Sequence, residues 1–417
     1  METLSLLNDE VNIVNLSEIK GRDILIIGLQ PWYYNIGSNC KDIATRLAEH
    51  NRVLYVNKPL NRKTWHSKAK DEGVQLHYDI IKHKKNKIEK IQKNMWQLFP
   101  ESIIESINWL PSTFAFKKIN YINNSRLSKN IRAALKELNF NDIILFNDND
   151  IYNGYYLKEL LKPSLYIYYC RDYMRGYDYW RKHCTVLEPE LIKKSDAVVT
   201  NSEYYAAYCG MHNHSSYYIG QGCNLNLFDG NKNYETPADI KKIAYPIIGY
   251  TGTLDADRLD EKIIAAIAET HTRFNIVLVG PEYKNFENTI LRNYDNVHFL
   301  GRKPLQELPA YINAFDVCIN PQVKNEITKG NYPLKIDEYL AMGKPVVATR
   351  TEAMRMFEPY TYLSDSPLEF VSLTQKALSE NNDELAQSRK AFASTHTWEK
   401  SLEELCKVIN KHLSILK

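Results

Sequence analysis

Two charged residues in the last third of the chain, Lys335 and Glu338, have the spacing of side chains on one face of a helix. The sequence predicts a short helix over 334–342, which begins after Pro333 and ends at Gly343. An ammonium group and the free N–H groups of a helix start suit a diphosphate. A carboxylate one turn later can accept hydrogen bonds from both hydroxyls of a ribose. The pair therefore indicates a nucleotide diphosphate, although an amphipathic helix with a surface ion pair has the same pattern.

A second group of candidate residues lies in the first half of the chain, where Arg171 and Asp172 follow the predicted strand 165–169. Polar residues at the junction of a strand and a loop are where function collects. Asp172 could act as a base or anchor for an acceptor hydroxyl, and Arg171–Asp172 could equally be a structural pair. Gly37 would let a substrate approach the backbone closely, or it is a plain turn glycine.

Metal and disulfide chemistry find little support. The triplet Asp148-Asn149-Asp150 imitates an Asp-x-Asp metal motif, but such triplets arise easily by chance, and 255–257 forms another. The seven cysteines are scattered and never spaced as Cys-x-x-Cys, which argues against a zinc site or a disulfide framework. We therefore expect no metal and no cofactor.

The bulk composition narrows the class of protein. A chain of 417 residues suggests two domains. A net charge of +3 argues against wholesale binding of nucleic acid. No apolar run approaches the roughly 20 residues that span a bilayer. Residues 1–10 lack the basic and apolar regions of a secretory signal. The expected location is the cytoplasm.

Apolar runs alternate with helical patterns in both halves of the chain. This alternation predicts parallel sheets with helices on both faces, that is, an α/β protein with two doubly wound, Rossmann-like domains. Residues 58–140 interrupt this alternation of strands and helices. The polar stretch 229–239 is the expected linker between the two halves. After residue 366 the chain is predicted to be helical, with a break at 394–397. The predicted strands are 24–29, 53–56, 143–146, 165–169, 197–200, 247–250, 274–279, 297–300, 317–320 and 346–349. The predicted helices before 366 include 39–49, 259–270, 283–292, 305–314 and 334–342.

Four stretches, in order along nearly the whole chain, resemble a glycosyltransferase of the GT-B fold, close to glycosyltransferase family four of bacterial surface-polysaccharide synthesis. They are 30–56, 218–228, 248–255 and 330–349. The resemblance implies two domains that face each other across a cleft. We expect an acceptor-binding domain at 1–228, a nucleotide-sugar domain at 229–393, and a C-terminal helix at 394–417 that returns to the first domain.

The resemblance also implies which residues hold the donor. Glu338 corresponds to the carboxylate that binds the donor ribose, and Lys335 to a side chain beside the diphosphate. The remaining donor positions that the resemblance or its phosphate-facing loop indicates are Gly252, Thr253, Arg258, Gly280, Pro281, Phe299, Gly301, Pro333 and Leu334. The candidate catalytic residues are Asp172 and Lys335, and the candidate acceptor residues are Gly37, Arg171 and Asp172.

Three positions depart from the family pattern. Gly330 stands where the family has a second glutamate, and Thr253 where it has an arginine, with Arg258 near the place of its lysine. The histidine that several members carry near 170–172 is absent. The resemblance implies retention of configuration, and the glycine at 330 leaves inversion open.

The segment 58–116 offers two interpretations. Residues 58–93 hold eleven Lys and Arg against four Asp and Glu, and apolar residues follow, among them Trp109 and Phe114. Such a segment could rest on an anionic membrane leaflet and reach a lipid-linked acceptor. It could equally be a solvated insertion whose apolar residues join the core.

The sequence thus favours a cytoplasmic, metal-independent glycosyltransferase. It would move a sugar from a nucleotide diphosphate sugar, of UDP or GDP type, onto a glycan or lipid-linked acceptor. If the segment 58–116 rests on the membrane, the enzyme would act at its inner face. The alternatives are a GT-B sugar-nucleotide epimerase or hydrolase and a catalytically silent sugar-nucleotide-binding protein. A dehydrogenase is disfavoured because no Gly-x-Gly-x-x-Gly follows a strand.

Overall fold

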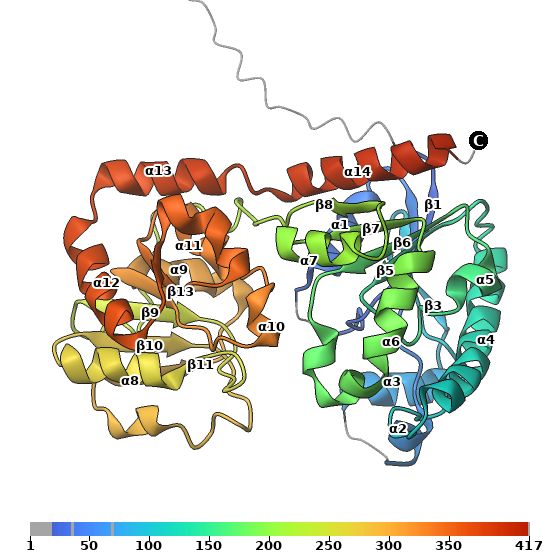
Figure 1. Ribbon diagram of the computed structural model, residues 1–417, viewed down its shortest axis with the longest axis horizontal. Coiled ribbons are helices and arrows are strands. Elements are labelled where there is room, and N and C mark those ends of the chain that lie inside the picture. Colours follow the sequence, from blue (N-terminus) through green and yellow to red (C-terminus); the bar gives the residue numbers. More distant parts are fainter. Residues whose placement is uncertain (1–18, 35–36, 68–70, 416–417) are drawn as a thin grey trace, which may run out of the picture.

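Two twisted sheets organise the chain, one in each of two domains that lie side by side (Figure 1). The computed structural model describes residues 19–34, 37–67 and 71–415. Strands β1 to β8 form the sheet of the first domain, and strands β9 to β14 form that of the second. No helix in these described ranges has the length and apolar character needed to cross a membrane.

The first sheet has eight strands in the order β3-β4-β2-β1-β5-β6-β7-β8. β3 pairs antiparallel with β4, and the other pairings are parallel. Its central strands are continuous apolar runs because helices cover both faces. The strands are β1 (Asp23–Ile27), β2 (Arg52–Val56), β3 (Ile88–Gln92), β4 (Met95–Leu98), β5 (Ile144–Asp148), β6 (Leu165–Cys170), β7 (Ala197–Thr200) and β8 (Ser216–Tyr218).

The helices of the first domain connect these strands and cover the sheet. The longest, α4, is capped at its start by Ser112, whose side chain accepts a hydrogen bond from the Ala115 backbone. The helices are α1 (Asn39–Leu47), α2 (Arg62–Ser67), α3 (Glu72–Ile81), α4 (Thr113–Glu137), α5 (Leu157–Leu161), the 3₁₀ turn η2 (Met174–Gly176), α6 (Asp178–Lys194) and α7 (Glu203–Gly210).

The second sheet has six parallel strands in the order β11-β10-β9-β12-β13-β14. The order reverses between β9 and β12, and ligands of such sheets bind beyond the carboxyl ends of the strands at this switch point. The strands are β9 (Ile247–Thr251), β10 (Asn275–Val279), β11 (Val297–Gly301), β12 (Val317–Asn320), β13 (Val346–Thr349) and β14 (Tyr362–Ser364). Between them lie α8 (Glu261–Thr270), η3 (Ile290–Asn293), η4 (Leu305–Glu307), α9 (Leu308–Ala314), α10 (Glu326–Lys329), α11 (Lys335–Ala341) and η5 (Glu352–Tyr360).

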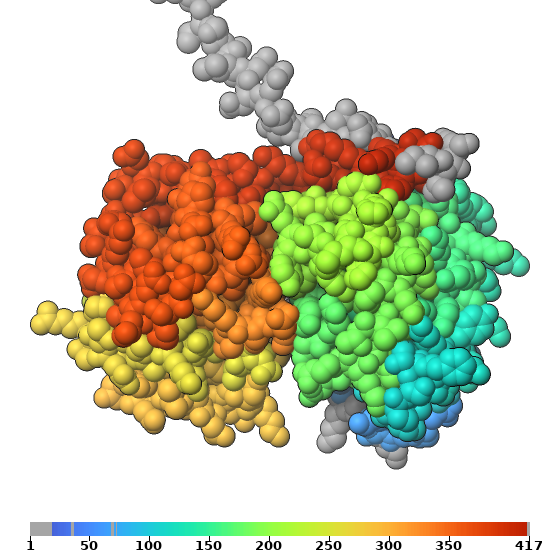
Figure 2. Space-filling view, in the orientation of Figure 1, coloured from blue at the N-terminus to red at the C-terminus, as the bar shows by residue number. Residues whose placement is uncertain are grey.

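The C-terminal helices tie the two domains together. α12 (Pro367–Glu380) and α13 (Asp383–Ala393) pack on the second domain, and α14 (Trp398–Ile415) continues across the top of the first (Figure 1). Trp398, Leu402 and Leu405 are buried in the core of the first domain, against the face of its sheet. The expected return of the last helix is therefore confirmed. The space-filling view shows the domains touching along their upper part, with a notch between them below (Figure 2).

The predicted strands are present, and the described residues form four further strands, β3, β4, β8 and β14, where no strand was predicted. The helix predicted over 283–292 is wrong, because only the short turn η3 forms there. Asn285 explains the difference. Its side chain accepts from the Ala256 backbone at 3.4 Å and donates to Asp255 at 2.8 Å, so this segment clamps the loop after β9 instead of coiling.

Candidate active site

Lys335 lies at the switch point of the second sheet. α11 lies between α10 and β13. Its first residue is Lys335, whose Nζ donates to the hydroxyl of Tyr250, near the end of β9, at 2.7 Å. The same Nζ lies 3.9 Å from the centroid of that ring. Tyr250 in turn donates to the backbone carbonyl of Thr253 at 3.1 Å. The sequence did not single out Tyr250, although its place directly before the glycine loop was a usable signal.

The glycine loops beside Lys335 approach each other too closely for side chains. A Cβ at Gly252 would lie 2.5 Å from Lys335 Nζ, and one at Gly280 would lie 1.8 Å from the carbonyl oxygen of Gly252. Both glycines have positive φ angles, 142° and 158°. Gly280 also donates its N–H to the carbonyl of Gly301 at 2.9 Å. The carboxyl ends of β9, β10 and β11 are thereby joined into one surface.

The other predicted donor residues line this surface or support it. Pro281 accepts a hydrogen bond from the Leu254 backbone at 2.9 Å. The half-buried ring of Phe299, on β11, lies 4.6 Å from the guanidinium of Arg292. At the start of α11, the carbonyl of Pro333 accepts from Ile336 N, and that of Leu334 from Glu338 N. The structure thus brings the predicted donor residues of β9, β10, β11 and α11 to one edge of the sheet.

Glu338 is a half-buried carboxylate without a hydrogen-bond partner among the described side chains and backbone groups. Burial raises its pKa to about 7, against the effect of the Lys335 ammonium, and Asp337 raises it further. Neither of its oxygens is a fully buried atom without a partner, so the carboxylate is open to the donors of a ligand. Its position therefore suits the hydroxyls of a ribose.

Asp337, the neighbour of Glu338, has a structural role. It is fully buried and accepts from the Tyr332 hydroxyl at 2.5 Å and from His396 Nδ1 at 2.8 Å. Burial raises the pKa of Asp337, while His396 and Tyr332 lower it. Because His396 lies two residues before α14, this network fixes α11 against the chain that crosses between the domains. This network was not predictable from the sequence.

In the first domain, Arg171 and Asp172 follow β6 at the carboxyl edge of the sheet, as predicted. Arg171 donates to Asp148 at 2.6 Å and to Asp172 at 2.5 Å. Burial lowers the pKa of Arg171, but both carboxylates raise it, and the result lies well above the ordinary value. The side chain of Asn149 accepts from the backbone N–H groups of both Arg171 and Asp172, at 2.7 and 3.1 Å. Asp172 is thus held by its neighbours and remains partly exposed.

The triplet 148–150 has structural partners. Asp148 is buried and accepts from Arg171 and from the Leu29 backbone, so it joins the ends of β1, β5 and β6. Asp150 accepts from the backbone and the side chain of Asn153 at 3.0 and 2.7 Å. Among the described residues no group of three or more His, Cys, Asp or Glu side chains has an arrangement that could hold a metal ion.

Arg258 connects the two sides of the site. Its position in the loop before α8 belongs to the second domain, and its guanidinium donates to the hydroxyl of Tyr177 in the first. Burial lowers the pKa of Arg258, whereas Tyr177 and Asp172 raise it above the ordinary value. The arginine therefore lies within the electrostatic reach of Asp172, which places the two domains' candidate residues around one space.

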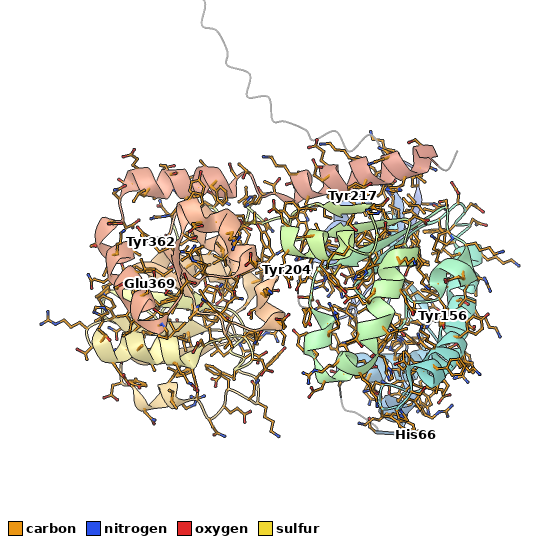
Figure 3. All side chains as sticks on the ribbon, in the orientation of Figure 1. His66, Tyr156, Tyr204, Tyr217, Tyr362 and Glu369 are labelled. Carbon is orange, nitrogen blue, oxygen red and sulfur yellow. The ribbon has the colours of Figure 1, made fainter. Side chains whose placement is uncertain are left out.

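Gly330 is explained by packing between the domains. A Cβ there would lie 2.2 Å from the ring of Tyr204, on α7 of the first domain. The hydroxyl of Ser202 donates to the carbonyl of Gly330 at 2.9 Å, and Lys329 Nζ lies 5.5 Å from the centroid of the Tyr204 ring. Figure 3 shows Tyr204 at the boundary between the domains. Gly37, by contrast, is exposed and has open space around it.

The comparisons with known proteins agree with this geometry. Residues 245–372 match the family model described as glycosyl transferases group 1. TuaH of Bacillus subtilis (strain 168), which is named as a teichuronic acid biosynthesis glycosyltransferase, is 26% identical over 248 residues. This alignment covers 56% of the chain and 62% of TuaH, so the chain spans less than two thirds of that relative's length.

Solved structures share the fold over almost the whole chain. The sucrose-phosphate synthase of Thermosynechococcus elongatus superposes with a TM-score of 0.68 at 14% identity, covering 94% of this chain and 100% of that one. Anabaena HepE, in complex with UDP and glucose, gives 0.61 at 15% identity with the same coverage. An Escherichia coli trehalose-6-phosphate protein bound with UDP-2-fluoro glucose gives 0.65 at 11%, covering 94% and 99%. The GT-B fold expected from the sequence is confirmed.

Proposed function

Because the chain carries a group 1 glycosyltransferase domain within a GT-B fold, we propose that it is a glycosyltransferase of bacterial surface-polysaccharide biosynthesis. It moves a sugar from a nucleotide diphosphate sugar to a glycan or lipid-linked acceptor. The observation that carries the proposal is the convergence of Lys335, the Gly252 loop and the half-buried carboxylate of Glu338 at one edge of the second sheet.

In this proposal the donor lies along that edge. Glu338 accepts from the ribose hydroxyls, and the diphosphate lies beside Lys335 and Gly252, where the absence of a Cβ leaves room for it. When the donor binds, the guanidinium of Arg258 exchanges its hydrogen bond to the Tyr177 hydroxyl for one to a phosphate oxygen. The bond to the charged phosphate is stronger than the bond to the neutral hydroxyl. UDP is the favoured nucleotide because structural relatives are described as UDP or UDP-sugar complexes.

The acceptor hydroxyl attacks the anomeric carbon from the same face as the departing diphosphate, and the new bond forms as the bond to the diphosphate breaks. The transition state resembles an oxocarbenium ion, as in glycoside hydrolysis. Lys335 stabilises the negative charge that grows on the leaving diphosphate, which needs no metal. Asp172 receives the proton of the acceptor hydroxyl or anchors that hydroxyl, with Arg171 holding the carboxylate. We propose retention of configuration, following the family resemblance.

The proposal includes contact with a membrane through the segment 58–116. Some of its apolar residues, Phe99 and Phe116 among them, are buried, and others such as Trp96 are half-buried. Trp109 and Phe114 are each 69% exposed, and Lys118 lies 4.5 Å from the Phe114 ring. Aromatic side chains beside lysines suit the interface of an anionic leaflet. Replacing both aromatics by serine should abolish co-sedimentation with phosphatidylglycerol vesicles; unchanged co-sedimentation would count against this contact.

A thermal-shift experiment tests the donor site. UDP, GDP and ADP are compared on the wild type and on Lys335→Met, with the exposed Lys284→Met as the matched control. A nucleotide at 100 times its Kd stabilises the folded state by about 2.7 kcal/mol. We expect one nucleotide to raise the Tm of the wild type and the control, and to do so much less for Lys335→Met. The absence of a response to all three would refute the proposal.

Turnover distinguishes the enzyme from its alternatives. Release of UDP from UDP-sugars is measured with and without a cell-envelope glycan fraction as the acceptor. A transferase consumes donor only when the acceptor is present and gives a lengthened glycan. Equal consumption without acceptor would indicate an epimerase or hydrolase, and binding without consumption would indicate a silent binding protein.

A further inference from the structure

A cavity of about 280 Å³ opens at the carboxyl edge of the first sheet, between the starts of α4 and α6. Its size is near the lower end of ligand pockets, which hold about 300–1,000 Å³. We call it the first-domain pocket. It is lined by Lys58, Pro59, Asn61, Ile104, Glu105, Ile107, Asn120, Asn123, Tyr152, Asn153, Tyr179 and Trp180.

Lys58 is the distinctive group in the pocket. It follows β2, is largely buried, and places its ammonium 5.6 Å from the centroid of the Trp180 ring. No described residue accepts a hydrogen bond from it or lies within ion-pair distance. Burial lowers its pKa, an effect that Asp150 and Asp148 oppose. Its Nζ is not one of the fully buried atoms that lack a partner, so the ammonium faces the open space of the pocket, where an anionic ligand can form a charge-assisted hydrogen bond with it.

The acidic groups around the pocket already have hydrogen-bond partners. Glu105 is paired with Arg62 at 2.7 Å and with Arg126 at 2.8 Å. These hydrogen bonds lower the pKa of Glu105 to about 2, so it stays ionised and paired. Asp150 is bound by Asn153, and Asp148 by Arg171. Of the two charged side chains among the described residues that line the pocket, Glu105 is paired and Lys58 has no ion-pair partner.

The rest of the lining has the chemistry of a sugar site. The amide oxygen of Asn61 accepts hydrogen bonds within the protein, so its N–H groups can donate to a sugar hydroxyl. The amide nitrogen of Asn153 donates within the protein, so its oxygen can accept from a sugar hydroxyl. Tyr179 is 51% exposed, and its ring can cover the apolar C–H face of a pyranose. Trp180 and Tyr152, with ring centroids 4.3 Å apart, form the floor.

We propose that the first-domain pocket binds an acidic sugar unit of the acceptor, with the anionic group of that unit on Lys58 and its ring against Tyr179. The anionic group is a carboxylate or a phosphate, which Lys58 recognises in the same way. The turn 148–150 connects the pocket with Arg171 and Asp172. At one end Asp148 accepts a hydrogen bond from Arg171, and at the other Asp150 interacts electrostatically with Lys58. An acceptor chain that is anchored here can therefore present its terminal hydroxyl at Asp172.

This inference rests on the proposed function, and its test is kept independent of the donor. Binding of 4-nitrophenyl β-D-glucuronide, glucose 6-phosphate and the neutral 4-nitrophenyl β-D-glucoside is measured by ligand-observed NMR on the full chain. The variants are Lys58→Met, which keeps the apolar stem, and Tyr179→Ala at an exposed ring. Lys63→Met, at an exposed lysine of α2, is the control.

The glucuronide, the sugar phosphate or both should bind at least 10-fold more tightly than the glucoside, and which of them binds identifies the anionic group. Loss of a charge-assisted hydrogen bond should weaken that binding about 10- to 100-fold in Lys58→Met and leave it unchanged in Lys63→Met. Tyr179→Ala should weaken both anionic and neutral sugars.

Equal binding of the neutral sugar, no binding of any probe, or full binding to Lys58→Met would each overturn the inference. The Tm of each variant with UDP and GDP is recorded in parallel. A nucleotide response without binding of the acidic sugars refutes the pocket alone. Binding of the acidic sugars without a nucleotide response refutes the proposed donor site alone.

Discussion

Glu338→Gln should make the unliganded protein more stable at alkaline pH while it weakens nucleotide binding. The carboxylate is half-buried, lacks a hydrogen-bond donor among the described residues, and has a pKa of about 7 because of burial, against an ordinary value of 4.5. Glutamine has nearly the same shape and carries no charge. The substitution therefore removes the cost of ionising a partly buried group, and it replaces one of the two acceptor oxygens that the ribose hydroxyls need by an amide donor.

The size and sign of the effect follow from proton linkage. Between pH 4.5 and about 7 the folded protein keeps a proton on Glu338 that the unfolded chain has lost, so the free energy of unfolding decreases as the pH rises. Each decade of pH corresponds to about 1.4 kcal/mol, which sets an upper limit of about 3 kcal/mol. Partial contact with solvent reduces the expected value to about 1–2 kcal/mol.

Urea unfolding at pH 5 and pH 8 measures this difference. Glu338→Gln should match the wild type at pH 5 and exceed it by about 1–2 kcal/mol at pH 8. Glu137→Gln, at an exposed position of α4 where no pKa shift is resolved, should follow the pH dependence of the wild type and serves as the control. A Glu338→Gln variant with the same pH dependence as the wild type would show that this carboxylate is well solvated, and the argument would fail.

Two further substitutions separate chemistry from scaffold. Asp172→Asn should lower kcat about 100-fold or more without changing the affinity for the nucleotide, because Asp172 lies on the opposite domain; unchanged turnover would reduce Asp172 to a structural partner of Arg171. Gly280→Ala should destabilise the protein by about 2–4 kcal/mol in urea, since its Cβ would lie 1.8 Å from a backbone oxygen. Gly37→Ala, with open space around it, should change the urea midpoint little; equal effects of the two alanines would contradict the steric explanation.

Much of the fold could be predicted because its signals are local. A run such as 24–27 is apolar at every position, which favours a strand that is covered on both faces, and the structure buries it completely. The short strand β8 escaped prediction because its three residues are only half-buried and carry no apolar run. The segment 283–292 misled because its helical pattern competes with the hydrogen bonds that Asn285 makes to the loop after β9.

The site was predictable where a residue's role depends on its own element and unpredictable where it depends on a distant one. The sequence indicated Lys335 and Glu338 because both lie on one short helix. It could not indicate Tyr177, whose hydroxyl accepts a hydrogen bond from Arg258, a residue 81 positions further along the chain. The same holds for Lys58, whose surroundings come from residues of the 104–123 and 150–180 regions. Side chains that meet only in the folded molecule leave no spacing to recognise.

Gly330 shows how a departure from a family pattern acquires a physical reason. In sequence it reads as the loss of a glutamate beside the donor sugar. In the structure the volume above it is occupied by the ring of Tyr204, which comes from the first domain, while Ser202 binds the carbonyl of Gly330 at 2.9 Å. A side chain at 330 would separate the domains, because its Cβ would lie 2.2 Å from that ring. The glycine therefore permits a contact across the cleft, and the group that faces the donor sugar here has to come from elsewhere than position 330.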